Sequence, residues 1–197
     1  ALCTLEAANR GGADFLTLCE TNGGMLVTPF RDVTNVVAQK FPDAKIGVHC
    51  HNDSGLAAAN TLMAVSAGAL HVQGTINGVG ERCGNVSLAT VLPNLVLKMK
   101  KETKTKLNLT DLSSLVKFTY DIMNMHPDTQ APFIGKSAFA HKGGIHVSAV
   151  MKDSNMYEHI DPKLVGNKQR VLVSDLSGKS NISFKANELD IKYKDSK

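Results

Sequence analysis

Three short apolar runs, separated by helical stretches at a regular spacing, constrain the fold of this chain most. The runs cover residues 15–19, 46–49 and 71–76, and each follows a helical segment and a short turn. Their ends lie 30 positions apart from Thr21 to His51, and 26 positions apart from His51 to Asn77. Because this is the spacing of right-handed βα units, the sequence predicts a parallel sheet of three strands.

The third run carries polar side chains on one strand face. His71, Gln73 and Thr75 alternate with apolar residues, whereas parallel strands covered on both faces read as continuous apolar runs. A polar face fits the inside of a β/α barrel, where reacting groups lie at the carboxyl ends of the strands. A complete barrel takes about 250 residues. We therefore predict an α/β fold in which residues 1–101 are the C-terminal part of a (β/α)8 TIM barrel, with about three βα units present and about five strands outside this chain.

The pattern changes after Lys101. Apolar residues keep helical spacing from Thr110, the predicted N-cap, to about Met125. Residues 132–148 are rich in turn residues yet apolar, which predicts an irregular, packed and functional segment. A short helix with a lysine-rich end is predicted within 177–197. Residues 102–197 are therefore predicted to form a mainly helical accessory region that contributes to a dimer and to the partner's active site.

Composition favours an ordinary globular protein of the cytoplasm. Of the 197 residues 43% are hydrophobic, and 22 basic against 18 acidic residues leave a net charge of +4. The lysines are not interleaved with aromatic residues, so we predict no nucleic-acid partner. No apolar run is long enough to cross a membrane. The four cysteines form no C-x-x-C pair and are read as reduced thiols. Since the first residue is Ala1, we expect a piece of a longer protein.

The sequence GVHCHND places two histidines at the predicted end of the second strand. Successive strand side chains point to opposite faces, so His49 and His51 share one face and Cys50 lies on the other. A lone histidine is more often a hydrogen-bonded core residue, but a same-face pair can present two nitrogens to one divalent ion. We predict a metal site here that needs oxygen ligands from elsewhere.

The sequence GTINGVGERCGN, residues 74–85, is the best source of those oxygens. Its four glycines let the backbone approach a ligand closely, and Glu81, Arg82 and Asn85 supply polar groups. A dinucleotide loop is disfavoured because the glycine spacing is one residue too long for G-x-G-x-x-G. The alternative for Glu81 and Arg82 is a local ion pair that braces the loop.

These two motifs together resemble the enzymes that make isopropylmalate, homocitrate and citramalate, which belong to the metal-dependent barrel group that includes pyruvate carboxylase. The segments QAPFIGKSAFAHKGGIHVSAV, YEHIDPKLVGN and VLVSDLSGKSNI most resemble the citramalate-forming branch. The resemblance covers nearly the whole chain. It implies an acyltransferase that condenses acetyl-CoA with a 2-oxo acid, best pyruvate, in branched-chain amino-acid biosynthesis. It also implies a homodimer and a divalent metal: Mg, Mn or Zn.

The resemblance assigns roles residue by residue. His49, His51 and Asn85 are implied metal ligands, and Thr21 in CETNGG is the implied contact of the 2-oxo acid carboxylate. Glu81 and Arg82 are grouped with it as substrate-binding residues. Glu20 stands where the family has aspartate, and the site is predicted without it.

In the accessory region the implied residues form a second group. His146 and Tyr157 are the implied catalytic residues sent into the partner's site, with Asn155 as a polar companion. From the residues alone, His141, His146 and His159 could equally satisfy backbone carbonyls in a loop. The family's carboxylate ligand and general base are expected on strands outside this chain.

Three functions stay open at this point. One is the synthase, with 2-isopropylmalate or homocitrate synthase beside citramalate synthase. A lyase of the same barrel group would lack the region after Lys101. The third is an inert folding or dimerisation module, since three strands expose a sheet edge and apolar faces. We expect the isolated chain to self-associate and to lack turnover.

Overall fold

The computed structural model describes residues 1–173 and 178–191, apart from the side chain of Ser180. The chain divides into two compact units, residues 1–106 and residues 107–197.

The first unit is built on a three-stranded parallel sheet in the order β1-β2-β3. The strands are β1 (Phe15–Glu20), β2 (Lys45–Cys50) and β3 (His71–Gln73). Helices α1 (Leu2–Arg10), α2 (Val27–Lys40) and α3 (Ala57–Ser66) precede them in alternation. The predicted parallel βα arrangement is confirmed. The third strand ends earlier than predicted, at Gln73, and the chain continues from Gly74 as a loop.

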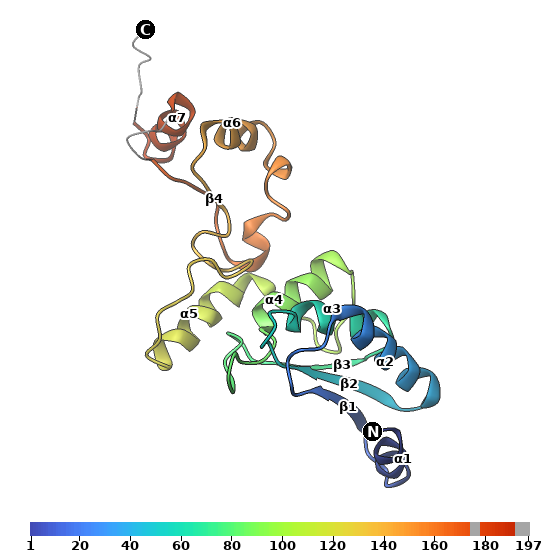
Figure 1. The fold of residues 1–197 in the computed structure, drawn as a ribbon. Helices are drawn as coiled ribbons and strands as arrows, with labels where there is room; N and C mark the ends of the chain where they lie inside the picture. Colours follow the sequence, from blue (N-terminus) through green and yellow to red (C-terminus); the bar gives the residue numbers. More distant parts are fainter. Residues whose placement is uncertain (174–177, 192–197) are drawn as a thin grey trace. The chain divides into compact units, whose positions relative to one another are not determined.

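The two faces of this sheet differ in chemistry. Register places Leu18 opposite Val48 and Glu20 opposite Cys50 on one face, which α2 and α3 cover (Figure 1). The core on this face consists mainly of Leu16, Phe30, Val37, Ile46, Val48, Cys50, Ala57, Ala64 and Val91. The other face aligns Cys19, His49 and Gln73 across the three strands. The polar face predicted for this sheet is therefore present.

The first unit ends in a helix that changes its winding. Helix α4 (Leu88–Pro93) runs into the π-helical turn η1 (Asn94–Lys98). Pro93 has no N–H to donate within the helix, and the next residue, Asn94, donates through its side chain to the carbonyl of Thr90 at 2.9 Å.

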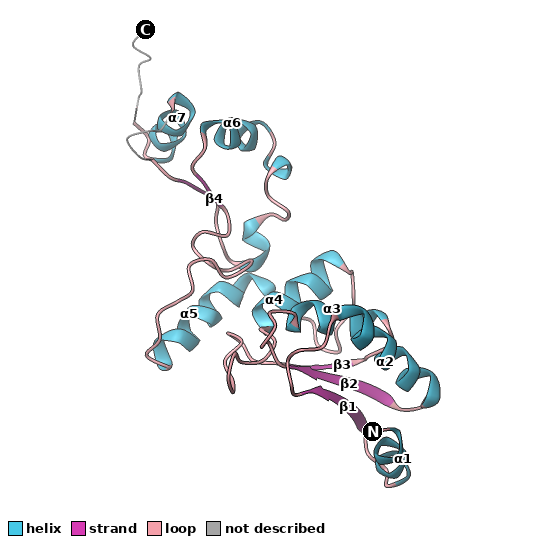
Figure 2. Ribbon diagram, in the orientation of Figure 1, coloured by secondary structure: helices cyan, strands magenta, loops and turns pink. Residues whose placement is uncertain are grey.

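The second unit has more helix than strand. Its elements are η2 (Leu109–Asp111), α5 (Leu112–Ile122), β4 (Ala140–His141), α6 (Gly144–Lys152), η3 (Ser154–Met156), η4 (Pro162–Val165), β5 (Arg170–Val171) and α7 (Lys179–Glu188). Strands β4 and β5 pair in parallel. The long connection from α5 to β4 is irregular, as predicted (Figure 2).

Two predictions for this unit are corrected. Thr110 is not the N-cap of α5, which is Asp111. Asn108 caps the preceding turn η2, and its Oδ1 accepts from Thr110 N at 3.2 Å and from Thr110 Oγ1 at 2.6 Å. The irregular segment predicted for 132–148 ends at Gly143, because α6 begins at Gly144 and buries Val147 and Val150. The helix predicted near the end is α7, and the lysine-rich end lies outside the described residues.

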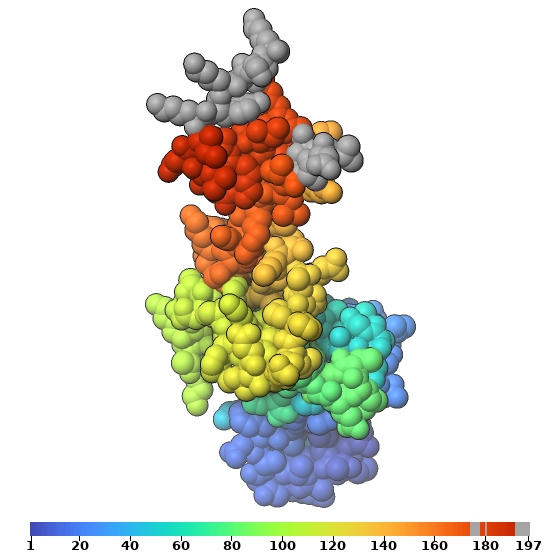
Figure 3. Space-filling model, turned by 90° about the vertical axis from the view of Figure 1, so that its left-hand side faces the viewer, coloured from blue at the N-terminus to red at the C-terminus, as the bar shows by residue number. Residues whose placement is uncertain are grey.

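Segments far apart in sequence meet in the second unit. Asn167 donates to the carbonyls of Phe133 and Gly135, both at 3.0 Å. The orange and amber parts of Figure 3 show the resulting contact between residues near 167 and residues near 135. The side chains of Phe139, Val165 and Val171 are almost fully buried around it.

Candidate functional site

The two histidines of β2 lie on the polar face at its carboxyl end. Their ring centroids are 5.4 Å apart, with the ring planes tilted by 59°. His49 is half-buried, and His51, one residue beyond the strand, is buried. The backbone N–H of His51 donates to the carbonyl of Glu20 at 3.2 Å, which ties its position to the end of β1.

Asn85 reaches the same place from 34 positions further along the chain. His51 and Asn85 form an isolated antiparallel bridge. On either side of it, Asn52 N donates to Gly84 O and Val86 N donates to Cys50 O, both at 2.9 Å. Tertiary structure thus places Asn85 beside His51, as the predicted metal site requires.

Glycine is required where the loop turns toward Asn85. Gly84 has φ of +83°, and a Cβ there would lie 1.9 Å from the carbonyl oxygen of Gly78. A Cβ on Gly80 would lie 2.1 Å from Nδ2 of Asn85. A side chain at position 84 would displace backbone, which cannot move aside as a flexible side chain can, and a side chain at position 80 would push against the Asn85 amide itself.

Two atoms of this group are buried without a hydrogen bond to any of the described residues. They are Nδ1 of His51 and Oδ1 of Asn85. The amide of Asn85 is oriented by its nitrogen, which donates to Val79 O at 3.4 Å and so leaves the oxygen for another partner. Buried polar atoms normally have a partner, and an imidazole nitrogen and an amide oxygen are both donors to divalent ions. The residues therefore fit a metal ion.

The set of donors is short of a carboxylate. The described residues contain no group of three or more His, Cys, Asp or Glu side chains arranged to hold a metal. The two imidazoles and the amide are the ligands that the sequence predicted for this chain, and the carboxylate was expected on strands outside it.

Arg82 joins three loops through one guanidinium. Its Nε and Nη2 donate to the carboxylate of Asp53 at 2.7 and 2.9 Å, and Nη2 also donates to the carbonyl of Thr21 at 2.6 Å. This hydrogen-bonded ion pair lowers the pKa of the Asp53 carboxyl below its usual 3.8 and raises the pKa of Arg82.

The bracing ion pair is therefore not the predicted one. Sequence reasoning paired Arg82 with Glu81, but Glu81 is exposed and the carboxylate that Arg82 binds is Asp53. Asp53 was missed, and its place directly after the two histidines was the only signal for it.

Thr21 and Glu20 lie at the end of β1 but differ in environment. Thr21 is exposed beside Arg82. Glu20 is buried on the opposite, helix-covered face, where its Oε1 accepts from Met25 N at 3.3 Å. Its other oxygen has no hydrogen bond within the described chain. Burial on that face also raises the pKa of the Cys50 thiol to about 11.

In the second unit the structure brings two predicted residues together. The rings of His146, on α6, and Tyr157 stack with centroids 4.3 Å apart and planes 22° apart. Both residues are exposed. Asn155, also exposed, hydrogen-bonds Asp153 through its backbone N–H and its Nδ2, both at 3.0 Å.

The other two histidines considered for this region lie beside other side chains. His141 Nε2 lies 3.1 Å from Oε1 of Glu158. The His159 ring lies 5.0 Å from the Phe133 ring and 5.9 Å from the Phe139 ring. The sequence left backbone carbonyls open as partners of these histidines and did not single out Glu158.

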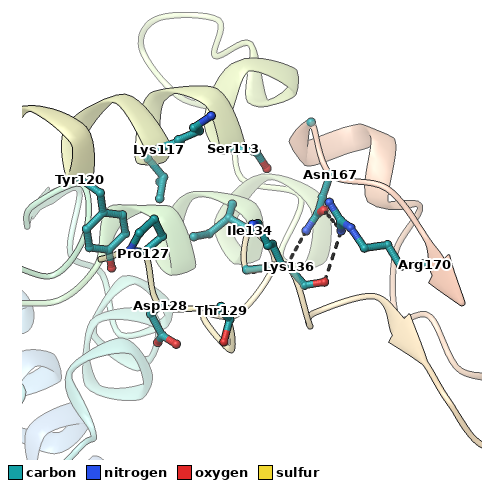
Figure 4. Close-up of a pocket in the computed structure, with 13 residues that line it drawn as sticks. Ser113, Lys117, Tyr120, Pro127, Asp128, Thr129, Ile134, Lys136, Asn167 and Arg170 are labelled. Carbon is teal, nitrogen blue, oxygen red and sulfur yellow. Dashed lines mark hydrogen bonds between the residues drawn. The ribbon is translucent and has the colours of Figure 1, made fainter. Parts of the chain in front are cut away.

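A separate pocket of about 310 Å³ lies beside α5 (Figure 4). Apolar residues such as Tyr120 and Ile134 line one part of it, and Arg170 lies at another, where its Nη1 donates to Asn167 Oδ1 at 2.9 Å. None of the predicted site residues lines this pocket. It therefore does not belong to the candidate site.

Comparison with known families accounts for most of the chain. A family described as HMGL-like matches residues 1–118, and one described as homocitrate synthase post-HMGL domain-like matches residues 133–197. The chain belongs to the HMGL-like family. The post-HMGL match covers the region that carries His146 and Tyr157.

Curated relatives narrow the likeness further. The chain is 51% identical over 191 residues to an (R)-citramalate synthase of Aquifex aeolicus, covering 97% of this chain and 36% of the relative. It is 49% identical to an (R)-citramalate synthase of Synechocystis, covering 94% and 35%. A 2-isopropylmalate synthase of Histophilus somni is 35% identical, covering 85% and 34%. The chain thus spans about a third of the length of these relatives.

Solved structures support the barrel fold. An HMG-CoA lyase of Bacillus subtilis matches with a TM-score of 0.53 and 25% identity, covering 61% of this chain and 41% of that one. An HMG-CoA lyase of Acinetobacter baumannii matches with a TM-score of 0.55 and 21% identity, covering 66% and 44%. Among the described residues no helix is long and apolar enough to span a membrane.

Proposed function

We propose that this chain is part of a cytoplasmic acyltransferase that condenses acetyl-CoA with a 2-oxo acid. One observation carries the proposal: His49, His51 and Asn85 gather at the carboxyl end of a parallel sheet, with Nδ1 of His51 and Oδ1 of Asn85 buried and unpartnered. Pyruvate is the proposed 2-oxo acid and (R)-citramalate the product. Support comes from the relatives of that name, which are 45–51% identical to the chain.

In this proposal His49, His51 and Asn85 hold a divalent ion: Mg, Mn or Zn. When bound, such an ion supplies Lewis acidity to a keto oxygen. The carboxylate of the 2-oxo acid is bound near Thr21. Arg82 and Glu81 lie at the same edge, and the bidentate contact with Asp53 holds the guanidinium of Arg82 in place.

The proposed reaction balances without a further reactant. A base takes a proton from the acetyl methyl group, and a carbon–carbon bond forms between that carbon and the keto carbon. The keto oxygen receives a proton and becomes a hydroxyl. Water then cleaves the thioester and releases free CoA. We assign proton handling to His146 and Tyr157 because an imidazole and a phenol stacked together can bind and pass a proton.

Two subunits are proposed to build each site. Residues 102–197 are the proposed accessory region, and Asn155 is proposed to support the pair formed by His146 and Tyr157. The test is subunit complementation. Mixing an inactive His51→Ala variant with an inactive His146→Ala variant is expected to restore activity, because a mixed dimer contains one site with both residues intact. If the mixture stays as inactive as its components, the two-subunit site is wrong.

The central test uses a hybrid enzyme. The chain replaces the matching segment of the Aquifex aeolicus (R)-citramalate synthase, and CoA release is measured with pyruvate. His51→Ala is expected to lower the rate about 100-fold or more, as loss of a metal ligand does. EDTA should stop the wild-type hybrid and Mn²⁺ should restore it. The matched control is His71→Ala, on the same sheet face but at the start of β3, which should keep most of the rate.

An unchanged rate for His51→Ala would exclude the metal role. The 2-oxo acid is tested in the same assay with pyruvate, 2-oxoisovalerate and 2-oxoglutarate, since 2-isopropylmalate and homocitrate synthases are the nearest alternatives.

A lyase is the second candidate, because two of the matched solved structures are HMG-CoA lyases. The match of residues 133–197 to a homocitrate synthase domain favours the synthase. Supplying the hybrid with citramalyl-CoA or HMG-CoA and measuring cleavage separates the two. The third candidate, an inert dimerisation module, requires that the hybrid fold and form dimers but release no CoA with any 2-oxo acid.

A further inference from the structure

A buried histidine–glutamate pair, His141 and Glu158, joins the two ends of the segment that carries His146 and Tyr157. Nε2 of His141 lies 3.1 Å from Oε1 of Glu158, and the two side chains are 9% and 3% exposed. Gln169 Nε2 donates to the same oxygen at 2.9 Å. At this depth water is a poor substitute for a protein partner. Nε2 of His141 therefore depends on Glu158 for its hydrogen bond, while Oε1 of Glu158 is shared by His141 and Gln169.

Both members of the pair are anchored in the backbone of the second unit. His141 belongs to β4, and its carbonyl accepts from Leu172 N at 2.9 Å beside β5. The next residue, Lys142, is held through its carbonyl by Nδ2 of Asn181 at 2.8 Å. Glu158 follows η3, and its N–H donates to Ser154 O at 2.9 Å. The pair therefore links two ordered stretches of backbone.

The stacked rings are attached directly to these anchors. Tyr157 immediately precedes Glu158, and His146 lies five positions after His141, on a helix that buries Val147 and Val150. The rings of His146 and Tyr157 are themselves exposed. Stacking holds an exposed pair of rings only weakly, so it does not fix their geometry alone. The buried pair supplies that constraint.

We propose that His141 and Glu158 are positioning residues that hold His146 and Tyr157 as one stacked unit. The effect on catalysis rests on the proposed function, because it assumes that these two rings handle the proton. The positioning of the rings does not depend on that assumption. One measurement tests the positioning and a second tests its effect on catalysis.

The first measurement is NMR of the histidine rings in the 197-residue chain. Stacking on Tyr157 places the His146 ring protons in the ring current of the phenol, and Tyr157→Leu defines their position without it. Glu158→Leu removes the acceptor of His141 and Gln169 and is expected to move the His146 signals to that same position. Glu158→Gln keeps an acceptor oxygen and should restore the stacked position.

Loss of stability alone must give a different pattern. Val165→Ala makes a cavity in the same unit, because Val165 is fully buried, and it removes neither His141 nor Glu158. It should lower the Tm while leaving the His146 signals in place. If Glu158→Leu leaves those signals unmoved, the positioning role is wrong.

The second measurement is kinetics in the hybrid enzyme. Glu158→Leu is expected to lower kcat about 10- to 100-fold with KM for pyruvate little changed, because a misplaced proton-handling group costs rate rather than binding. Glu158→Gln should recover most of kcat. If His146→Ala lowers kcat and Glu158→Leu does not, the positioning role is overturned. If His146→Ala itself has no effect, the assigned function of the rings fails, and the NMR result still decides the geometry.

Discussion

Arg82 shows how one side chain orders the loops around a candidate site. Its guanidinium binds the carboxylate of Asp53 and the carbonyl of Thr21, which belong to the loops after β2 and β1. Planar, bidentate pairing fixes direction as well as distance. Arg82 adopts φ of +58°, a left-handed conformation that is costly for a residue with a side chain. The contacts with Asp53 and Thr21 offset that cost.

The first prediction concerns the pH dependence of this ion pair. Because the folded-state pKa of Asp53 is lowered, its stabilising effect is present above the unfolded value near 3.8 and is lost as the pH falls through the folded value. Wild type should therefore have a higher Tm than Asp53→Asn at pH 6, and the difference should shrink as the pH falls below 3.8 and through the lowered folded-state value. Asp43→Asn, an exposed change without this partner, is the control. A difference that does not shrink on acidification contradicts the assignment.

At the scale of residues, the sequence predicted which side chains form the candidate site better than it predicted which side chains contact one another. It singled out His49, His51 and Asn85, and tertiary structure brings them together. Nδ1 of His51 and Oδ1 of Asn85 are buried there without a hydrogen bond to the described residues. Their role as metal ligands stays a prediction. It did not predict that Asp53 would bind Arg82, because the pair joins loops 29 positions apart. Such a contact depends on side-chain direction in the folded chain.

At the scale of elements, loop geometry decides whether the site forms. The loop from Gly74 to Asn85 must bring its amide back to the end of β2, and it does so through glycines that approach neighbouring backbone. Strand order and pitch place the loop at the right edge of the sheet. The backbone conformation of Gly84 sets the direction in which Asn85 leaves it.

The second prediction compares two glycines with similar φ. Gly55→Ala introduces a Cβ at φ of +74° with nothing within 4 Å, so it should cost about 1 kcal/mol of unfolding free energy. Gly84→Ala adds a Cβ 1.9 Å from a carbonyl oxygen and should cost about 3 kcal/mol. Urea unfolding measures both. Gly84→Ala should also weaken Mn²⁺ binding, and equal costs for the two variants would contradict this account.

Helices and strands were predictable where the apolar periodicity was strong. Their ends were predicted poorly where a capping residue sets the boundary. The strands and α5 followed from apolar spacing, whereas the turn that starts before α5 is set by Asn108, two positions ahead of the predicted cap. Helix α6 was missed because it begins at a glycine pair typical of turns. Burial of Val147 and Val150 outweighs that local preference.

At the scale of the whole molecule, apolar surface points to self-association. Helix α5 buries Leu112, Val116 and Tyr120, yet Leu115, Phe118 and Ile122 on another side are 43%, 60% and 68% exposed. Their spacing places them along one stripe of the helix. A contiguous exposed apolar stripe is typical of an interface.

The third prediction is that the 197-residue chain forms a dimer. Size-exclusion chromatography with light scattering should give about twice 21.1 kDa. Phe118→Ser combined with Ile122→Ser should shift the mass toward the monomer, because the stripe loses most of its apolar area. Ile145→Ser, which changes an exposed apolar residue on α6, should leave the dimer intact. A wild-type chain that stays monomeric at micromolar concentration refutes the prediction.

The sequence by itself determined the parallel βα layout, the polar sheet face and the residue types of the candidate site, because spacing and alternation are local properties of the chain. Tertiary structure alone decided that Asn85 meets His51, that Arg82 binds Asp53 and that His141 binds Glu158. Each of these contacts joins residues separated by 17 to 34 positions. Contacts of that kind are set by how elements pack, which no short stretch of residues specifies.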